Sequence, residues 1–98
     1  MLVKVMSAYR DIVAICDSEL LGKKFEEGIF QLDIKESFFG GGELEEEAAI
    51  KIMEEMSKND ATFNIVGKNS VDAALKAGII TEGGIRQIQG IPFALVLL

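Results

Sequence analysis

Carboxylates are the most frequent side chains in this sequence that could do chemistry, and they cluster behind a glycine loop. The stretch ESFFGGGELEEE, residues 36–47, places a block of glutamates directly after three glycines. Carboxylate oxygens bind magnesium and calcium, but no spacing here matches a calcium-binding loop. Acids in the first turn of a helix also interact with the positive end of the helix dipole. We therefore interpret the block as a solvated helix start and predict no metal site.

A glycine loop that runs into a helix is also the shape of a phosphate cradle. After Gly40–Gly42 a phosphate would meet carboxylates, so we reject that interpretation for this loop. The stretch IVGKNSVDAALKAG is a better anion candidate, because free amides and a lysine start its helix, although the Walker spacing is missing. An ordinary helix cap at Asn69 is the favoured alternative. The anion candidate comprises Gly67, Lys68, Asn69 and Ser70.

The sequence offers little for nucleophilic or acid–base catalysis. It contains no histidine and a single cysteine, Cys16, which lies in the apolar run IVAIC. A buried thiol without a histidine partner is inert, and one cysteine forms no internal disulfide. Asp17 and Glu36 could act as acid and base, but no spacing singles out a pair. We predict no catalytic residue and no cofactor.

An aromatic pair, Phe38 and Phe39, precedes the glycines. If the pair ends a strand, one ring enters the core and the other lies on the far face. Burial of both rings is the favoured interpretation, because aromatic pairs are more often packing than contact sites. An exposed ring would be a candidate contact for a partner. We also predict a positive φ for at least one residue of Gly40–Gly42, where the chain turns sharply from strand to helix.

Polar residues near this turn complete a hypothetical binding surface. If the strand at residues 29–35 pairs with residues 13–17, these side chains gather at one end of the sheet. The hypothetical binding surface comprises Asp17, Lys23, Lys24, Glu36, Ser37, Phe38, Phe39, Gly40 and Gly41.

Length and composition limit the classes of protein that fit. The 98 residues, 49% of them hydrophobic, predict one domain over residues 1–98. The net charge of −6 argues against DNA or broad nucleic-acid binding, which needs a concentrated positive field. No secretory leader is visible, and the longest apolar run, residues 93–98, is too short to cross a bilayer. We expect a soluble cytoplasmic protein with no membrane partner.

Hydrophobic periodicity divides the chain into strands and helices. Apolar or alternating runs predict strands at residues 2–7, 11–16, 29–35, 61–66, 85–89 and 93–98. The first two, separated by the short stretch AYR, predict a β-hairpin at the N-terminus. Apolar residues four apart predict helices at residues 43–58 and 69–77, the first burying Leu44, Ala48, Ile52 and Met56 and the second closed by Gly78.

The run at residues 93–98 has no polar side chain, so we expect it to be covered on both faces in the middle of the sheet, after a turn that contains the single proline. The fold class is α+β, with five or six mostly antiparallel or mixed strands and two helices packed on one face.

Motifs spread along the chain form a specific combination: CDSELLGK, ESFFGG and GIPFALV, residues 16–23, 36–41 and 90–96. The combination resembles an archaeal family of short proteins of unknown function, domain of unknown function 424, over nearly the whole chain. This sequence has an extra glycine in the loop at residues 40–42. The resemblance implies an archaeal cytoplasm and a role around the ribosome or RNA, and it brings no assigned reaction.

Three kinds of function stay open. The favoured one is a non-catalytic interaction module of archaeal translation or RNA metabolism, with a protein or ribonucleoprotein partner. Its contacts would be Phe38 or Phe39 together with Lys23 and Lys24. The alternative is a small carboxylate-based enzyme with a site beside the turn at residues 36–42. A homodimer or larger assembly of identical chains is the third.

Overall fold

The sheet grows from the N-terminal hairpin that the sequence predicts. A computed structural model describes residues 1–97, in which β1 (Leu2–Met6) and β2 (Ile12–Cys16) pair antiparallel. β2 also pairs in parallel with β6 (Thr62–Val66), and β6 pairs antiparallel with β8 (Ile91–Val96). These four strands form the centre of the sheet.

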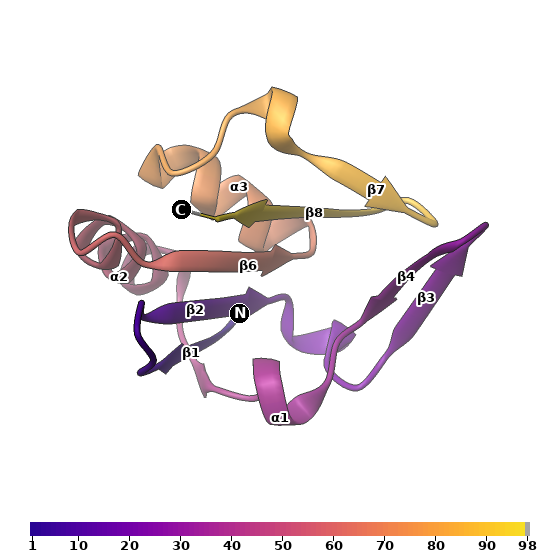
Figure 1. Cartoon of the computed structure of the whole chain (residues 1–98), viewed down its shortest axis with the longest axis horizontal. Helices are drawn as coiled ribbons and strands as arrows, with labels where there is room; N and C mark the ends of the chain where they lie inside the picture. The colour runs from indigo at the N-terminus through magenta and orange to yellow at the C-terminus, as the bar shows by residue number, and fades with distance from the viewer. Residues whose placement is uncertain (98) are drawn as a thin grey trace.

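Two short strands complete the sheet at its edges. β5 (Gly42–Glu43) pairs with β1, and β7 (Arg86–Ile88) pairs with β8. The strand order is β5-β1-β2-β6-β8-β7, and one parallel pair makes the sheet mixed (Figure 1).

Two helices cover one face of the sheet. α2 (Glu46–Lys58) and α3 (Lys68–Ala77) pack against each other, and a turn of 3₁₀ helix, η2 (Glu82–Gly84), leads from α3 to β7. The core between helices and sheet is formed by buried residues of both layers: Val3, Val13, Ile15, Ala49, Met53, Ala61, Phe63, Ile65, Val71, Ala73 and Ala74. The α+β fold with two helices on one face is confirmed.

The opposite face is covered only in part. A hairpin of β3 (Lys24–Glu27) and β4 (Phe30–Asp33) leans out from this face toward the β7–β8 turn (Figure 1). The short helix α1 (Glu36–Phe39) and the 3₁₀ turn η1 (Ser18–Leu20) pack beside its base. A second, smaller core lies here, formed by Ala14, Cys16, Leu20, Ile34, Phe39 and Val66.

This hairpin differs from the prediction for residues 29–35. The strand pairs with β3, which the sequence analysis did not predict, and not with β2. β3 consists mostly of charged residues and shows no hydrophobic pattern, because a two-stranded hairpin buries little of either face. Gly28, with a φ of 62°, supplies the positive φ that the tight turn needs. Phe30 consequently lies 67% exposed near the tip of the hairpin.

The turn at residues 36–42 is also built differently. ESFF forms the helical turn α1 and not the end of a strand, and none of Gly40–Gly42 has a positive φ, so that prediction is wrong. At Gly41 the reason for glycine is space, because a Cβ would overlap the carbonyl group of Val3. Glycine is required there by close backbone approach rather than by torsion.

The first long helix begins later than predicted, whereas the second begins at Lys68, one residue before its predicted start. The segment around Glu43 forms strand β5, so α2 begins only at Glu46, and its deepest residues are Ala49 and Met53. Leu44 lies outside the helix but still packs on the core. The second helix ends as predicted at Gly78, which has a left-handed φ of 77°.

Strand β8 lies inside the sheet, but its side chains are not covered on both faces. Ala94 is buried, whereas Leu95 is 55% exposed, and Leu97, just beyond the strand, is 71% exposed. An unbroken apolar strand is buried on both sides only where both faces of the sheet are covered, and the face opposite the helices is covered only in part. Pro92 lies in β8 and not in the turn, which is formed by Gln89 and Gly90. Leu98 lies outside the described residues.

Candidate functional site

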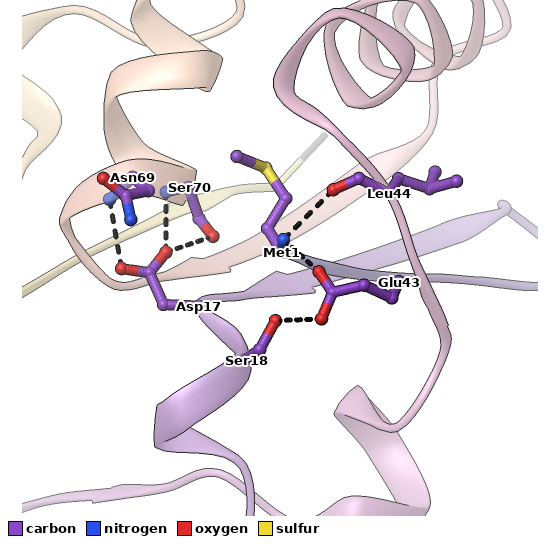
Figure 2. A network of polar contacts seen from close by, with 7 residues as sticks. All are labelled: Met1, Asp17, Ser18, Glu43, Leu44, Asn69 and Ser70. Carbon is purple, nitrogen blue, oxygen red and sulfur yellow. Dashed lines mark hydrogen bonds and ion pairs between the residues drawn. The ribbon is translucent and has the colours of Figure 1, made fainter.

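Asp17 directly follows β2, and its carboxylate is hydrogen-bonded to the first turn of α3 (Figure 2). Oδ1 accepts hydrogen bonds from the backbone N–H of Ser70 at 2.8 Å and from its hydroxyl at 2.7 Å. Oδ2 accepts one from the backbone N–H of Asn69 at 3.1 Å. Asp17 is only 4% exposed. The carboxylate thus satisfies amides at the positive end of the helix dipole and anchors α3 to β2.

The anion candidate at the start of α3 therefore contains an anion that the chain itself supplies. Gly67, at a φ of 106°, precedes the helix, and a Cβ there would collide with the Asp17 carboxylate. Lys68 is exposed. Asn69 lies inside the helix and Gly67 is the cap residue, so the predicted cap role of Asn69 is wrong. An external phosphate would have to share the Asn69 and Ser70 amides with Asp17.

A second polar network fixes the corner between β5 and β1 (Figure 2). The N-terminal amine of Met1 donates to Glu43 Oε2 and, at 3.1 Å, to the carbonyl oxygen of Leu44. The hydroxyl of Ser18 donates to Glu43 Oε1. Two hydrogen bonds lower the pKa of Glu43: the one from the N-terminal amine has the larger effect, and the one from Ser18 has the smaller. Glu43 thus belongs to this corner and not to the first turn of α2.

The other polar candidates lie on the hairpin and on α1. Lys23 and Lys24 are exposed, and Lys24 Nζ lies 3.7 Å from a Glu26 carboxylate oxygen. Glu36 is exposed, as is Ser37, whose carbonyl oxygen accepts a hydrogen bond from Lys4 Nζ at 2.8 Å. None of these residues bonds to Asp17, whose oxygens are engaged with α3.

The aromatic pair divides between core and surface. Phe39 is 6% exposed in the second core, and Phe38 is half-buried. Their rings meet edge to face, with centroids 5.1 Å apart. Gly40 and Gly41 follow and turn the chain toward β5. Phe38 is the member of the pair that is available to contact a ligand.

A groove of about 450 Å³ opens beside Phe38, between the hairpin and the uncovered face of the sheet. Its floor comes from β6 and β8, with Asn64, Phe93 and Leu95. Its walls come from β4 and from α1, so Ser37, Phe38 and Phe39 are the predicted site residues that line it. We call this feature the hairpin groove.

The sequence analysis missed the floor of the hairpin groove. Asn64 faces the groove because its neighbours Phe63 and Ile65 point into the helix-side core. Its carboxamide makes no hydrogen bond to another residue among residues 1–97. A signal was present in the sequence: an asparagine interrupts the apolar strand TFNIV at the position opposite Leu95. A polar residue at an inward-facing strand position indicates an open face.

The single thiol is not a nucleophile. Cys16 is fully buried, and this burial, with the charge of Asp17 beside it, raises the pKa of the thiol to about 11. The thiolate is therefore nearly absent at neutral pH. Within residues 1–97, no group of three histidine, cysteine or acidic side chains is arranged to hold a metal ion. No helix of that described part is long and apolar enough to span a membrane.

Comparisons with known proteins agree with this architecture. An uncharacterized conserved protein from Methanopyrus kandleri has a similar structure, with a TM-score of 0.83 and 26% sequence identity. The match covers 97% of this chain and 88% of that protein. A search of curated proteins found no match. The family model described as "Protein of unknown function (DUF424)" matches residues 6–98. The chain therefore belongs to the DUF424 family of proteins of unknown function.

Proposed function

We propose that this protein is a non-catalytic interaction module that binds a protein partner through the hairpin groove. The observation that carries the proposal is Leu95, which is 55% exposed on β8 although the strand has a neighbour on each side. With Phe38 and Phe93 it gives the groove an apolar lining. Concave apolar surfaces with a few polar groups are typical of binding sites.

Charge favours a protein over a nucleic acid as this partner. The charged side chains lining the groove are Asp33 and Lys35, one of each sign. A phosphate backbone is held by several cationic contacts, and the chain as a whole carries a net charge of −6. The groove therefore offers apolar contact without a positive field.

The carboxylates that could serve catalysis are engaged or solvated. Asp17 accepts hydrogen bonds from α3, and Glu36 is exposed on α1. Catalytic acids and bases are usually held in a partly buried site that tunes their pKa. This arrangement supports binding rather than turnover.

The partner is a component of the archaeal translation apparatus, and the protein acts in the cytoplasm. The similar protein from Methanopyrus kandleri supports an archaeal setting. The role in translation rests on the family resemblance of the motifs at residues 16–23, 36–41 and 90–96. An acidic protein is also attracted electrostatically to basic partners, and ribosomal proteins are generally basic.

Capture from archaeal lysate at low salt tests the proposal. The wild type is compared with Leu95→Thr, which removes one apolar side chain from the groove and introduces a β-branched residue that suits a strand. Tyr9→Ala is the control, because Tyr9 is fully exposed and does not line the groove. We expect one protein partner to survive nuclease treatment, to be retained by Tyr9→Ala and to fall at least about tenfold with Leu95→Thr, as for a central interface side chain.

Two results would count against the proposal. Equal capture by Leu95→Thr and wild type would show that the groove is not the contact. A partner that nuclease removes would point to RNA in place of protein. A partner from a process other than translation would overturn only the assignment to translation.

A further inference from the structure

The hairpin groove contains an unpaired strand edge. β4 pairs only with β3, so it has one edge without a neighbour among residues 1–97. Three consecutive β4 residues, Gln31, Leu32 and Asp33, line the groove, and no β3 residue does. Consecutive strand residues point to opposite faces, so a groove lined by all three borders the edge of β4 and not one of its faces.

The backbone groups of this edge can be assigned from the hairpin register. Ile34 uses both its N–H and its carbonyl toward the β3 side, bonding the Lys23 carbonyl at 2.9 Å and the Gly22 N–H at 2.8 Å. In an antiparallel pair the residues alternate between bonding inward and outward. Leu32 therefore bonds inward, and the N–H and C=O groups of Gln31 and Asp33 point away from β3.

An edge strand with free backbone groups is a template for another strand. Proteins use such edges to bind extended peptides, because main-chain hydrogen bonds give affinity and adjacent pockets take alternate side chains. Here the adjacent pocket is apolar, with Phe93 and Leu95 on the floor. The two charges of the lining, Asp33 and Lys35, cancel, which suits an uncharged segment.

The hairpin is held in place for this role. Its tip is tied to the β7–β8 turn by Gln89, whose backbone N–H donates to Glu27 Oε1 at 2.9 Å and whose Nε2 donates to the Glu26 carbonyl at 2.6 Å. With its base fixed at Ile34, the free edge of β4 is held at both ends beside the sheet. A preorganised edge loses less conformational freedom when a strand is added.

We propose that the hairpin groove binds an uncharged, extended peptide segment of the partner, which adds as a third strand to β4 and places an apolar side chain on Phe93 and Leu95. The proposal rests on the function given above and names the class of ligand for the same groove. It requires backbone hydrogen bonds from Gln31 and Asp33, which a partner docking only through side chains does not need.

A peptide selection followed by backbone substitution tests this. A displayed library of uncharged eight-residue peptides is selected on the wild type, and peptides that also bind Leu95→Thr are discarded. Each backbone amide of a selected peptide is then replaced in turn by an ester, which removes one N–H donor. We expect losses of about three- to tenfold at alternate positions and little change between them, since a hydrogen bond is worth about 1 kcal/mol.

Matched variants of Gln31 test the protein side. Gln31→Pro removes the outward N–H at an edge position where proline is tolerated, and Gln31→Ala removes only the side chain. We expect the proline variant to bind the selected peptide about tenfold more weakly and the alanine variant to bind within twofold of wild type. Amide resonances of the hairpin confirm that the proline variant stays folded, and the ester scan decides if it does not.

The outcomes separate the two proposals. No Leu95-dependent peptide in the selection, or ester effects without a two-residue period, would overturn strand addition. A single-stranded RNA ten-mer that shifts the resonances of Gln31 and Leu95 while no peptide does would assign the groove to nucleic acid. If lysate capture depends on Leu95 but strand addition fails, the interaction module stands and only the peptide class is wrong. Self-association that shifts the Gln31 resonance would make a second copy of the chain the added strand and would also overturn the proposal.

Discussion

Replacing Asp17 with alanine should destabilise the fold more than the loss of an ordinary surface carboxylate. The side chain is 4% exposed and accepts hydrogen bonds from two backbone amides and one hydroxyl of α3. The amide of Asn69 can be solvated after the change because Asn69 is exposed. Ser70 is completely buried, so its N–H and hydroxyl would both lose their partner without gaining water.

The magnitude follows from these two buried donors. Each buried polar group left unsatisfied costs about 1–3 kcal/mol, and the lost interaction with the helix dipole adds up to about 1 kcal/mol. We expect Asp17→Ala to lower the free energy of unfolding by about 3–5 kcal/mol. A domain of this size is stable by roughly 5–15 kcal/mol, so the loss would be a large fraction of the total.

Urea unfolding of four proteins measures the effect: wild type, Asp17→Ala, Ser70→Ala and the double variant. Ser70→Ala should cost about 1 kcal/mol, because it removes one hydrogen bond together with its donor. The double variant should be about 1–2 kcal/mol more stable than the sum of the single losses, because the orphaned hydroxyl is then absent. A loss below about 1 kcal/mol for Asp17→Ala, or simple additivity, would refute the account of Asp17 as the anchor of α3.

Three further predictions concern Gly41, Leu95 and Cys16. Gly41→Ala should cost about 1–3 kcal/mol of unfolding free energy, because the new Cβ would meet the Val3 carbonyl. Gly42→Ala is the control and should cost under about 1 kcal/mol, because the space around Gly42 is open. Equal losses in urea melts would contradict the close-approach explanation. Leu95→Ala should cost about 1 kcal/mol or less, against about 3–5 kcal/mol for Phe63→Ala at 1% exposure, and a core-sized loss at Leu95 would mean that the groove floor is covered. Iodoacetamide should alkylate Cys16 at pH 7.5 only when the protein unfolds, and rapid labelling of the folded protein would contradict this. Because folding raises the pKa of the Cys16 thiol from 9.0 to about 11, the thiol of the unfolded chain ionises first as the pH rises. The free energy of unfolding should therefore fall between pH 9 and 11.

Local pattern decided much of the fold. β-branched runs at residues 2–7 and 11–16 predict a hairpin that is present as β1 and β2, because alternation and a short polar turn act over neighbouring residues. The long amphipathic helix and the Gly78 stop are predictable for the same reason. Motifs along the chain also identified the family.

Tertiary structure decided the site. The exposure of Leu95 depends on where the hairpin ends over the sheet, and the apolar run IPFALV contains no information about that distance. Nothing in the sequence distinguishes Gly41 from a flexible glycine, and only the structure shows the Val3 carbonyl packed against it. Asp17 and Ser70 are 53 residues apart in the chain, and only the parallel pairing of β2 with β6 brings the carboxylate to the start of α3. Periodicity reports which side of an element is apolar, whereas long-range packing determines what, if anything, covers that side.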